Sequence, residues 1–132
     1  MKRGGGSLLR AAAVAFLVVA AAGIVARRFT RYAVAGESMH PTLAAGEFVI
    51  ATRHAHSSRV RPGDVVLAVD PREPARVIVK RVGAVDAAGV WLAGDNPGAS
   101  TDSRTFGPVD PAGVLGRVVA VYWPPRAVRL VR

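Results

Sequence analysis

The sequence predicts a mainly β fold, a small antiparallel β-barrel or folded sheet, preceded by one N-terminal transmembrane helix. An uncharged apolar run occupies residues 11–26 of the 132-residue chain. Beyond Tyr32 the pattern changes to short valine-rich runs separated by Gly, Pro and Asp, and helical periodicity is weak there. Because the chain has no cysteine, it holds no disulfide and no thiolate metal site. A compact domain of about 100 residues has room for one active site.

Basic residues flank the apolar run on both sides. They are Lys2, Arg3 and Arg10 before it and Arg27, Arg28 and Arg31 after it. Its sixteen residues, as a helix, rise about 24 Å, which is less than the ~30 Å core of a bilayer. A full span therefore needs Leu8 and Leu9 as well, with Arg10 extending its charge toward the interface.

We divide the chain into a basic tail (1–10), a transmembrane signal anchor (11–28) and a β-rich domain (29–132). A cleavable signal peptide is the alternative to an anchor, because the small residues at 20–23 resemble a cleavage site. Positive charge on both flanks leaves the orientation in the membrane open.

Five valine-rich runs are the predicted strands: residues 48–52, 65–69, 76–85, 90–93 and 114–123. Turn signals fall between or beside them at Pro62-Gly63-Asp64, Asp70-Pro71, Asp95-Asn96-Pro97 and Gly107-Pro108. This spacing is typical of a small barrel or folded antiparallel sheet. In residues 126–132, Val and Leu alternate with Arg, which fits an edge strand or a membrane-surface contact.

The formal charge of +9 does not predict a nucleic-acid partner, because the basic residues are scattered and few aromatic side chains lie among them to stack bases. Solubility, together with attraction to an anionic bilayer surface, is the better explanation of the charge. All but two of the eighteen basic residues are arginine, and Lys80 is the only lysine beyond the tail. A lysine can lose its proton and an arginine cannot, so Lys80 is a candidate for proton transfer.

Lys80 lies in the predicted strand 76–85, where alternation places Ile78, Lys80 and Val82 on one face. If that face is buried, desolvation lowers the lysine pKa and lets the amine accept a proton near neutral pH. The alternative is a lysine at a sheet edge whose ammonium group reaches water.

Two other segments carry side chains suited to catalysis. In residues 36–43, Ser38 follows a glycine-containing turn and precedes Pro41, which suits a hydroxyl presented on a tight bend; a helix cap or turn serine is the alternative. Residues 94–104 concentrate short hydrogen-bonding side chains in one loop. Such a loop is typical of a framework that orients an active site, and equally of a surface turn rich in Asp and Asn.

Neither a metal nor a histidine base is expected. His54 and His56 form a His-x-His pair without a third ligand. His40 is two residues from Ser38, and closeness along the chain is a poor route to the geometry that a catalytic histidine needs. We therefore predict no metal and no cofactor.

Taken together, four segments resemble the type I signal peptidases, a family of serine proteases. They are Ser38-Met39-His40-Pro41-Thr42, residues 61–66, Lys80-Arg81-Val82 and residues 94–109. The resemblance implies that Ser38 is the nucleophile and Lys80 the general base. It also implies that Ser100 orients the lysine, that Asp102 and Arg104 form a supporting ion pair, and that a β-rich domain sits against the membrane.

Two features depart from many members of that family. Gly36 stands where some members carry a serine that donates a second hydrogen bond to the oxyanion, so a backbone group or a water serves here. Residues 83–89 run straight into the next strand without the large insertion of many members, as in a minimal catalytic core. The resemblance also implies shallow pockets for small side chains one and three residues before the cut. Their predicted lining is Val34, Met39, Leu43, Ile78 and Val79, each of which also suits a plain core.

We expect a single-pass protein of the cell membrane, with its catalytic domain outside the cytoplasm, that removes signal peptides through an acyl-enzyme. Its expected partners are precursor proteins and the lipid bilayer, and the oligomeric state stays open. One alternative is a dedicated maturation protease of the same family, such as one resembling the protease of the nickel superoxide dismutase precursor or a mitochondrial inner-membrane relative. Another is an inactive membrane-tethered domain that binds exported peptides.

Overall fold

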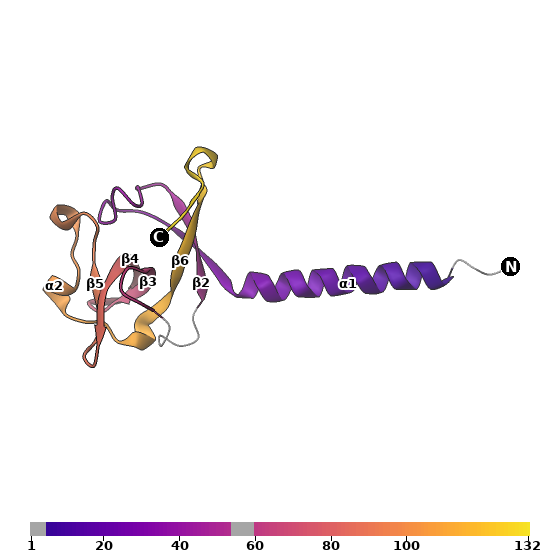
Figure 1. Ribbon diagram of the computed structural model, residues 1–132, viewed down its shortest axis with the longest axis horizontal. Helices are drawn as coiled ribbons and strands as arrows, with labels where there is room; N and C mark the ends of the chain where they lie inside the picture. Colours follow the sequence, from indigo (N-terminus) through magenta and orange to yellow (C-terminus); the bar gives the residue numbers. More distant parts are fainter. Residues whose placement is uncertain (1–4, 54–59) are drawn as a thin grey trace.

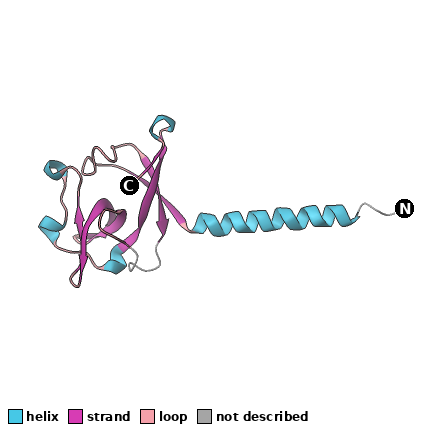
Figure 2. Cartoon of the chain, viewed as in Figure 1, coloured by secondary structure: helices cyan, strands magenta, loops and turns pink. Residues whose placement is uncertain are grey.

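The protein consists of one long helix and a seven-stranded antiparallel sheet (Figures 1 and 2). The computed structural model describes residues 5–53 and 60–132. Both parts of the predicted fold class, the antiparallel β domain and the N-terminal helix, are confirmed.

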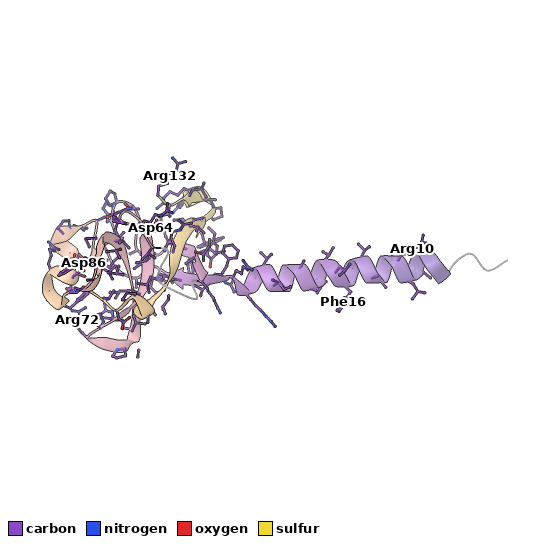
Figure 3. The ribbon with its side chains drawn as sticks, turned by 60° about the horizontal axis from the view of Figure 1, so that its bottom comes forward. Arg10, Phe16, Asp64, Arg72, Asp86 and Arg132 are labelled. Atoms are coloured by element: carbon purple, nitrogen blue, oxygen red, sulfur yellow. The ribbon has the colours of Figure 1, made fainter. Side chains whose placement is uncertain are left out.

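Helix α1 (Gly5–Arg27) projects from the β domain as a separate rod (Figure 1). Arg10 and Phe16 point away from its axis into open space (Figure 3). Its segment Gly6–Arg27 has the length and composition of a membrane span, and its most apolar part is not buried within the protein. That segment rises about 33 Å, enough for a ~30 Å bilayer core. Because the helix begins before position 11, it includes Leu8 and Leu9, the two residues that a full membrane span was expected to need.

The seven strands are β1 (Phe29–Ala33), β2 (Phe48–Arg53), β3 (Val65–Asp70), β4 (Glu73–Asp86), β5 (Gly89–Ala93), β6 (Val114–Trp123) and β7 (Arg129–Leu130). Their order across the sheet is β1-β2-β6-β3-β4-β5, with β7 paired to β6. Strand β6 pairs with β2 over most of its length and with β3 near its start. Register shifts in both pairings bend the sheet at β6.

Within residues 5–53 and 60–132, the connections contain four short helical turns: η2 (Pro97–Ala99), α2 (Ser103–Phe106), η3 (Pro111–Gly113) and η4 (Pro125–Ala127). Three of them lie between β5 and β6, and the polar loop that the sequence singled out passes through the first two. This loop lies at the end of β5, within reach of the neighbouring strand β4.

Strand β3 is buried on both faces because its alternate residues enter two different hydrophobic clusters. Val65 and Leu67 pack in the first cluster, and Val66 and Ala68 pack in the second. Strand β4 divides in the same way, with Val79 in the first cluster and Ile78 and Val82 in the second. A polar residue between Ile78 and Val82 on their face of β4 therefore has apolar neighbours along the strand.

The five predicted strands are present as β2 to β6, with β4 beginning three residues earlier than expected. Strand β1 was not predicted, because its five residues follow the apolar run almost directly. For residues 126–132 the sequence allowed an edge strand or a membrane-surface contact. The structure contains the strand: β7 pairs with β6, with Leu130 opposite Ala120.

Candidate active site

A cleft of about 460 Å³ opens where the segment after β1 faces strand β4. Residues 35–38 and residues 76–80 form most of its lining. Ala99 and Thr101, from the loop after β5, also contribute to its lining. The cleft therefore contains both Ser38 and Lys80, which lie far apart in the sequence.

Ser38 lies half-buried on a turn that is tied to the core and to the polar loop. The next residue, Met39, is fully buried, and its carbonyl accepts a hydrogen bond of 2.9 Å from the amide of Leu43. The carbonyl of Ser38 accepts a 2.9 Å hydrogen bond from the amide of Asn96. The side chain of Asn96 donates a further bond of 3.1 Å to the carbonyl of Glu37. Bonds before and after the serine thus fix its backbone.

Lys80 lies on β4 and only 4% of it is exposed. Ile78 and Val82, which share its face of the strand, belong to the second hydrophobic cluster. Burial lowers the pKa of the Lys80 side chain below its ordinary value. The carboxylate of Asp102 opposes this shift, and the positive charges of Arg76 and Arg72 reinforce it. The environment therefore favours the neutral amine more than water does.

A chain of hydrogen bonds runs from Lys80 into the polar loop. Lys80 Nζ donates to Ser100 Oγ at 3.1 Å, and Ser100 Oγ donates to Asp102 Oδ2 at 3.0 Å. Asp102 is 1% exposed and also accepts bonds from the amide of Gly94 and from the guanidinium of Arg104. Burial acts to raise the pKa of Asp102, but these hydrogen bonds outweigh it and hold the pKa well below its usual range. Asp102 is therefore ionised at neutral pH.

Gly94 lies where the serine turn and the polar loop meet. A Cβ atom at this position would collide with Ser100 Oγ and would lie 2.7 Å from the carbonyl oxygen of Ser38. A side chain here would push apart the two segments that carry Ser38 and Ser100. The requirement for glycine at this point is set by packing between segments, which a single sequence does not display.

An ion pair that was not predicted from the sequence joins three segments around the cleft. Arg81, next to Lys80, donates to both carboxylate oxygens of Asp95 at 2.8 and 2.7 Å. Thr42, from the serine motif, donates its hydroxyl to the same carboxylate at 2.5 Å. Arg81, Asp95 and Thr42 all lie within the segments that resemble the type I signal peptidases. Their place in these segments was the signal by which the sequence could have identified them.

The predicted pocket residues divide into two groups. Ile78 and Val79 line the cleft. Val34, Met39 and Leu43 lie in the first hydrophobic cluster and are not part of the lining of this cleft.

Gly36 also lines the cleft, and a Cβ added there would meet no atom within 4 Å. Tyr32, Arg72 and Arg76 line the cleft without having been predicted to do so.

The histidines are not brought into the cleft lining in the part of the chain that the structure describes. His40 is exposed on the serine turn, and His54 and His56 lie outside the described residues. Among residues 5–53 and 60–132, no group of three His, Asp or Glu side chains is placed to hold a metal ion.

Comparison with protein families matches this chain to the signal peptidase family, peptidase S26, over residues 7–90 and 83–123. The Mitochondrial ATP-independent inner membrane protease subunit 1a of Arabidopsis thaliana is 34% identical, over 68% of this chain and 68% of its own length. The human Mitochondrial inner membrane protease subunit 1 is 33% identical, over 67% of this chain and 66% of its own. Subunit 2 from Danio rerio is 30% identical, over 70% and 63%. The chain thus spans about two thirds of the length of these relatives.

Proposed function

The chain belongs to the signal peptidase family, peptidase S26, and on this basis we propose that it is a membrane-anchored serine endopeptidase of exported precursors. In this proposal Ser38 is the nucleophile and Lys80 is the general base. The observation that carries it is the buried Lys80, bonded to Ser100 and lining the same cleft as Ser38.

The direction of the hydrogen bonds supports a base at Lys80. Ser100 has one hydroxyl proton and donates it to the ionised Asp102, so its oxygen accepts from Lys80. A neutral amine that gives one N–H to Ser100 keeps its lone pair for another hydroxyl. In the proposed mechanism that hydroxyl belongs to Ser38.

The reaction then follows the chemistry of an acyl-enzyme. Lys80 Nζ takes the proton of Ser38 Oγ as this oxygen attacks the scissile carbonyl carbon. The resulting ammonium gives the proton to the leaving amine as the C–N bond breaks, which leaves an ester on Ser38. A water molecule then attacks the ester carbon while Lys80 takes a proton from this water. Lys80 gives that proton to Ser38 Oγ as the ester C–O bond breaks, which releases the acid product. The backbone N–H of Ser38 is the first donor to the oxyanion, and the space at Gly36 leaves room for a water as the second.

The substrate is proposed to bind as an extended strand between residues 35–38 and strand β4. On the side of β4 that β5 occupies, the described pairing begins only at Arg81, so residues 76–80 have room for a peptide strand. Ile78 and Val79 would then contact the small side chains one and three residues before the cut. Val34, Met39 and Leu43 would support these walls from the core.

Helix α1 is proposed to anchor the protein in the cell membrane by a single pass, with the β domain on the side that exported precursors reach. The length and composition of the helix support the anchor. The names of the relatives place those proteins in the mitochondrial inner membrane. The cell membrane is the location that we propose for this chain. The proposed partners are precursor proteins and the lipid bilayer.

A dedicated maturation protease is the second candidate function. Two observations favour it: the relatives bear the name of inner membrane protease subunits, and β4 and β5 are joined by a tight turn with no inserted region. This narrower function would be supported if the protein cleaved one precursor and did not cleave several unrelated precursors.

The test is to incubate the full-length chain, in detergent, with a precursor that carries a small-x-small site and to map the new N-terminus by mass spectrometry. We expect a single cut after the second small residue. Labelling of Ser38 by a serine acylator such as a penem would exclude an inactive peptide-binding domain. An uncut precursor together with an unlabelled Ser38 would contradict the proposal.

A further inference from the structure

Three basic residues of the described chain line the cleft, and their side chains differ in the hydrogen bonds and ion pairs that they form. Arg72 donates three hydrogen bonds to Asp70 and lies 5.2 Å from the ring centroid of Phe106. Lys80 is buried and bonded to Ser100. The side chain of Arg76 is exposed, and within the described ranges its guanidinium forms no hydrogen bond or ion pair.

The positive charge of Arg76 at its end of the cleft is not neutralised by a carboxylate in the described part of the chain. The nearby carboxylate of Asp70 is already engaged by Arg72 through both of its oxygens. Glu37 is the only carboxylate in the lining, and no ion pair joins it to Arg76 within the described part of the chain. Burial raises the pKa of Tyr32, and the charge of Arg76 opposes that shift, so this charge acts on the cleft wall.

Arg76 also lies at a defined place along the proposed substrate path. It precedes Lys80 by four residues on β4, a separation of about 13 Å along a strand, and alternation places it on the same face as Ile78. In the proposed binding mode, Ile78 and Val79 contact side chains up to three residues before the cut. A residue further from the cut, on the same extended chain, comes next to Arg76.

We propose that Arg76 makes the cleft selective for precursors that carry an acidic side chain four to six residues before the cut. This inference rests on the proposed protease function and narrows its substrate class. Lysine or arginine at the same place is disfavoured by repulsion. Because Arg76 is exposed, the preference for Asp over Lys is modest, about three- to tenfold in kcat/KM at low salt, and it weakens as salt is added.

The test uses peptides with one small-x-small cut site that differ at a single position in having Asp, Asn or Lys. The position is moved through the fourth, fifth and sixth residues before the cut. The enzyme is the full-length chain in an uncharged detergent, as wild type, Arg76→Gln and Arg76→Glu. Arg126→Glu is the matched control, because Arg126 is exposed on η4 and does not line the cleft.

At one or more positions the wild type and Arg126→Glu should prefer Asp, Arg76→Gln should lose the preference, and Arg76→Glu should prefer Lys. The Asn peptides report whether each variant is still an active protease. If Arg76→Glu cuts the Asn peptide normally and keeps the wild-type ratio of Asp to Lys, the inference is wrong while the proposed function stands. If no enzyme cuts any peptide, the proposed function fails and the inference fails with it.

Discussion

The hydroxyl of Ser100 donates its single proton to the carboxylate of Asp102 at a distance of 3.0 Å. Its oxygen can therefore meet the amine of Lys80 only as an acceptor. Since the low pKa of Asp102 keeps the carboxylate ionised, this arrangement persists across the neutral pH range. The pair thus sets both the position and the hydrogen-bond direction of Lys80.

Ser100→Ala should lower kcat by about 100-fold, because the amine of Lys80 loses the bond that positions it. We expect KM to change little, since Ser100 does not line the cleft. The measurement is steady-state cleavage of a small-x-small peptide. A rise in KM at constant kcat would instead assign Ser100 to substrate binding.

The rate should rise with pH through an apparent pKa below the ~10.4 of a free lysine. The reason is that burial lowers the pKa of Lys80 and only the neutral amine is active. A pH profile of kcat/KM checks this, with His40→Ala as the control that leaves the profile in place. A rate that stays flat at every pH below the ~10.4 of a free lysine would contradict a lysine base.

Asp102 should contribute stability that is present above pH ~3.9 and is lost as the pH falls further, because its pKa is depressed in the folded state. Compared by urea unfolding, wild type and Asp102→Asn should differ most near pH 6 and less toward pH 3. A gap that stays constant over this range would show that the carboxylate charge is not what stabilises the loop.

Gly94→Ala should abolish most activity and destabilise the domain, because the added methyl group collides with Ser100 Oγ and crowds the carbonyl of Ser38. Gly98→Ala is the matched control in the same loop, since a Cβ there meets no atom within 4 Å. Thermal unfolding and peptide cleavage measure both effects. If the two variants had the same activity and the same thermal stability, the segments that carry Ser38 and Ser100 could move apart without a loss of either.

Local patterns predicted the parts of the site that depend on one strand. Alternation along residues 76–85 was enough to place Lys80 with Ile78 and Val82 on one face. The contacts of Arg81 with Asp95 and Thr42 were not predictable in the same way, because three segments must meet in space to form them.

The same limit explains the pocket residues. Whether Val34, Met39 and Leu43 face the cleft or the core depends on the path of an irregular segment, which has no period to read. Strand β1 is similar, because only its pairing with β2 distinguishes it from the end of the apolar run.

Lys80→Arg tests the central claim most directly, because it keeps the positive charge and removes the accessible neutral state. The measurement is kcat/KM on a small-x-small peptide, with thermal unfolding to confirm the fold. We predict a loss of about 100- to 10,000-fold in a folded protein, while His40→Ala keeps most of its activity. A folded Lys80→Arg protein that cleaves near the wild-type rate, beside an inactive His40→Ala, would contradict a mechanism based on Ser38 and Lys80.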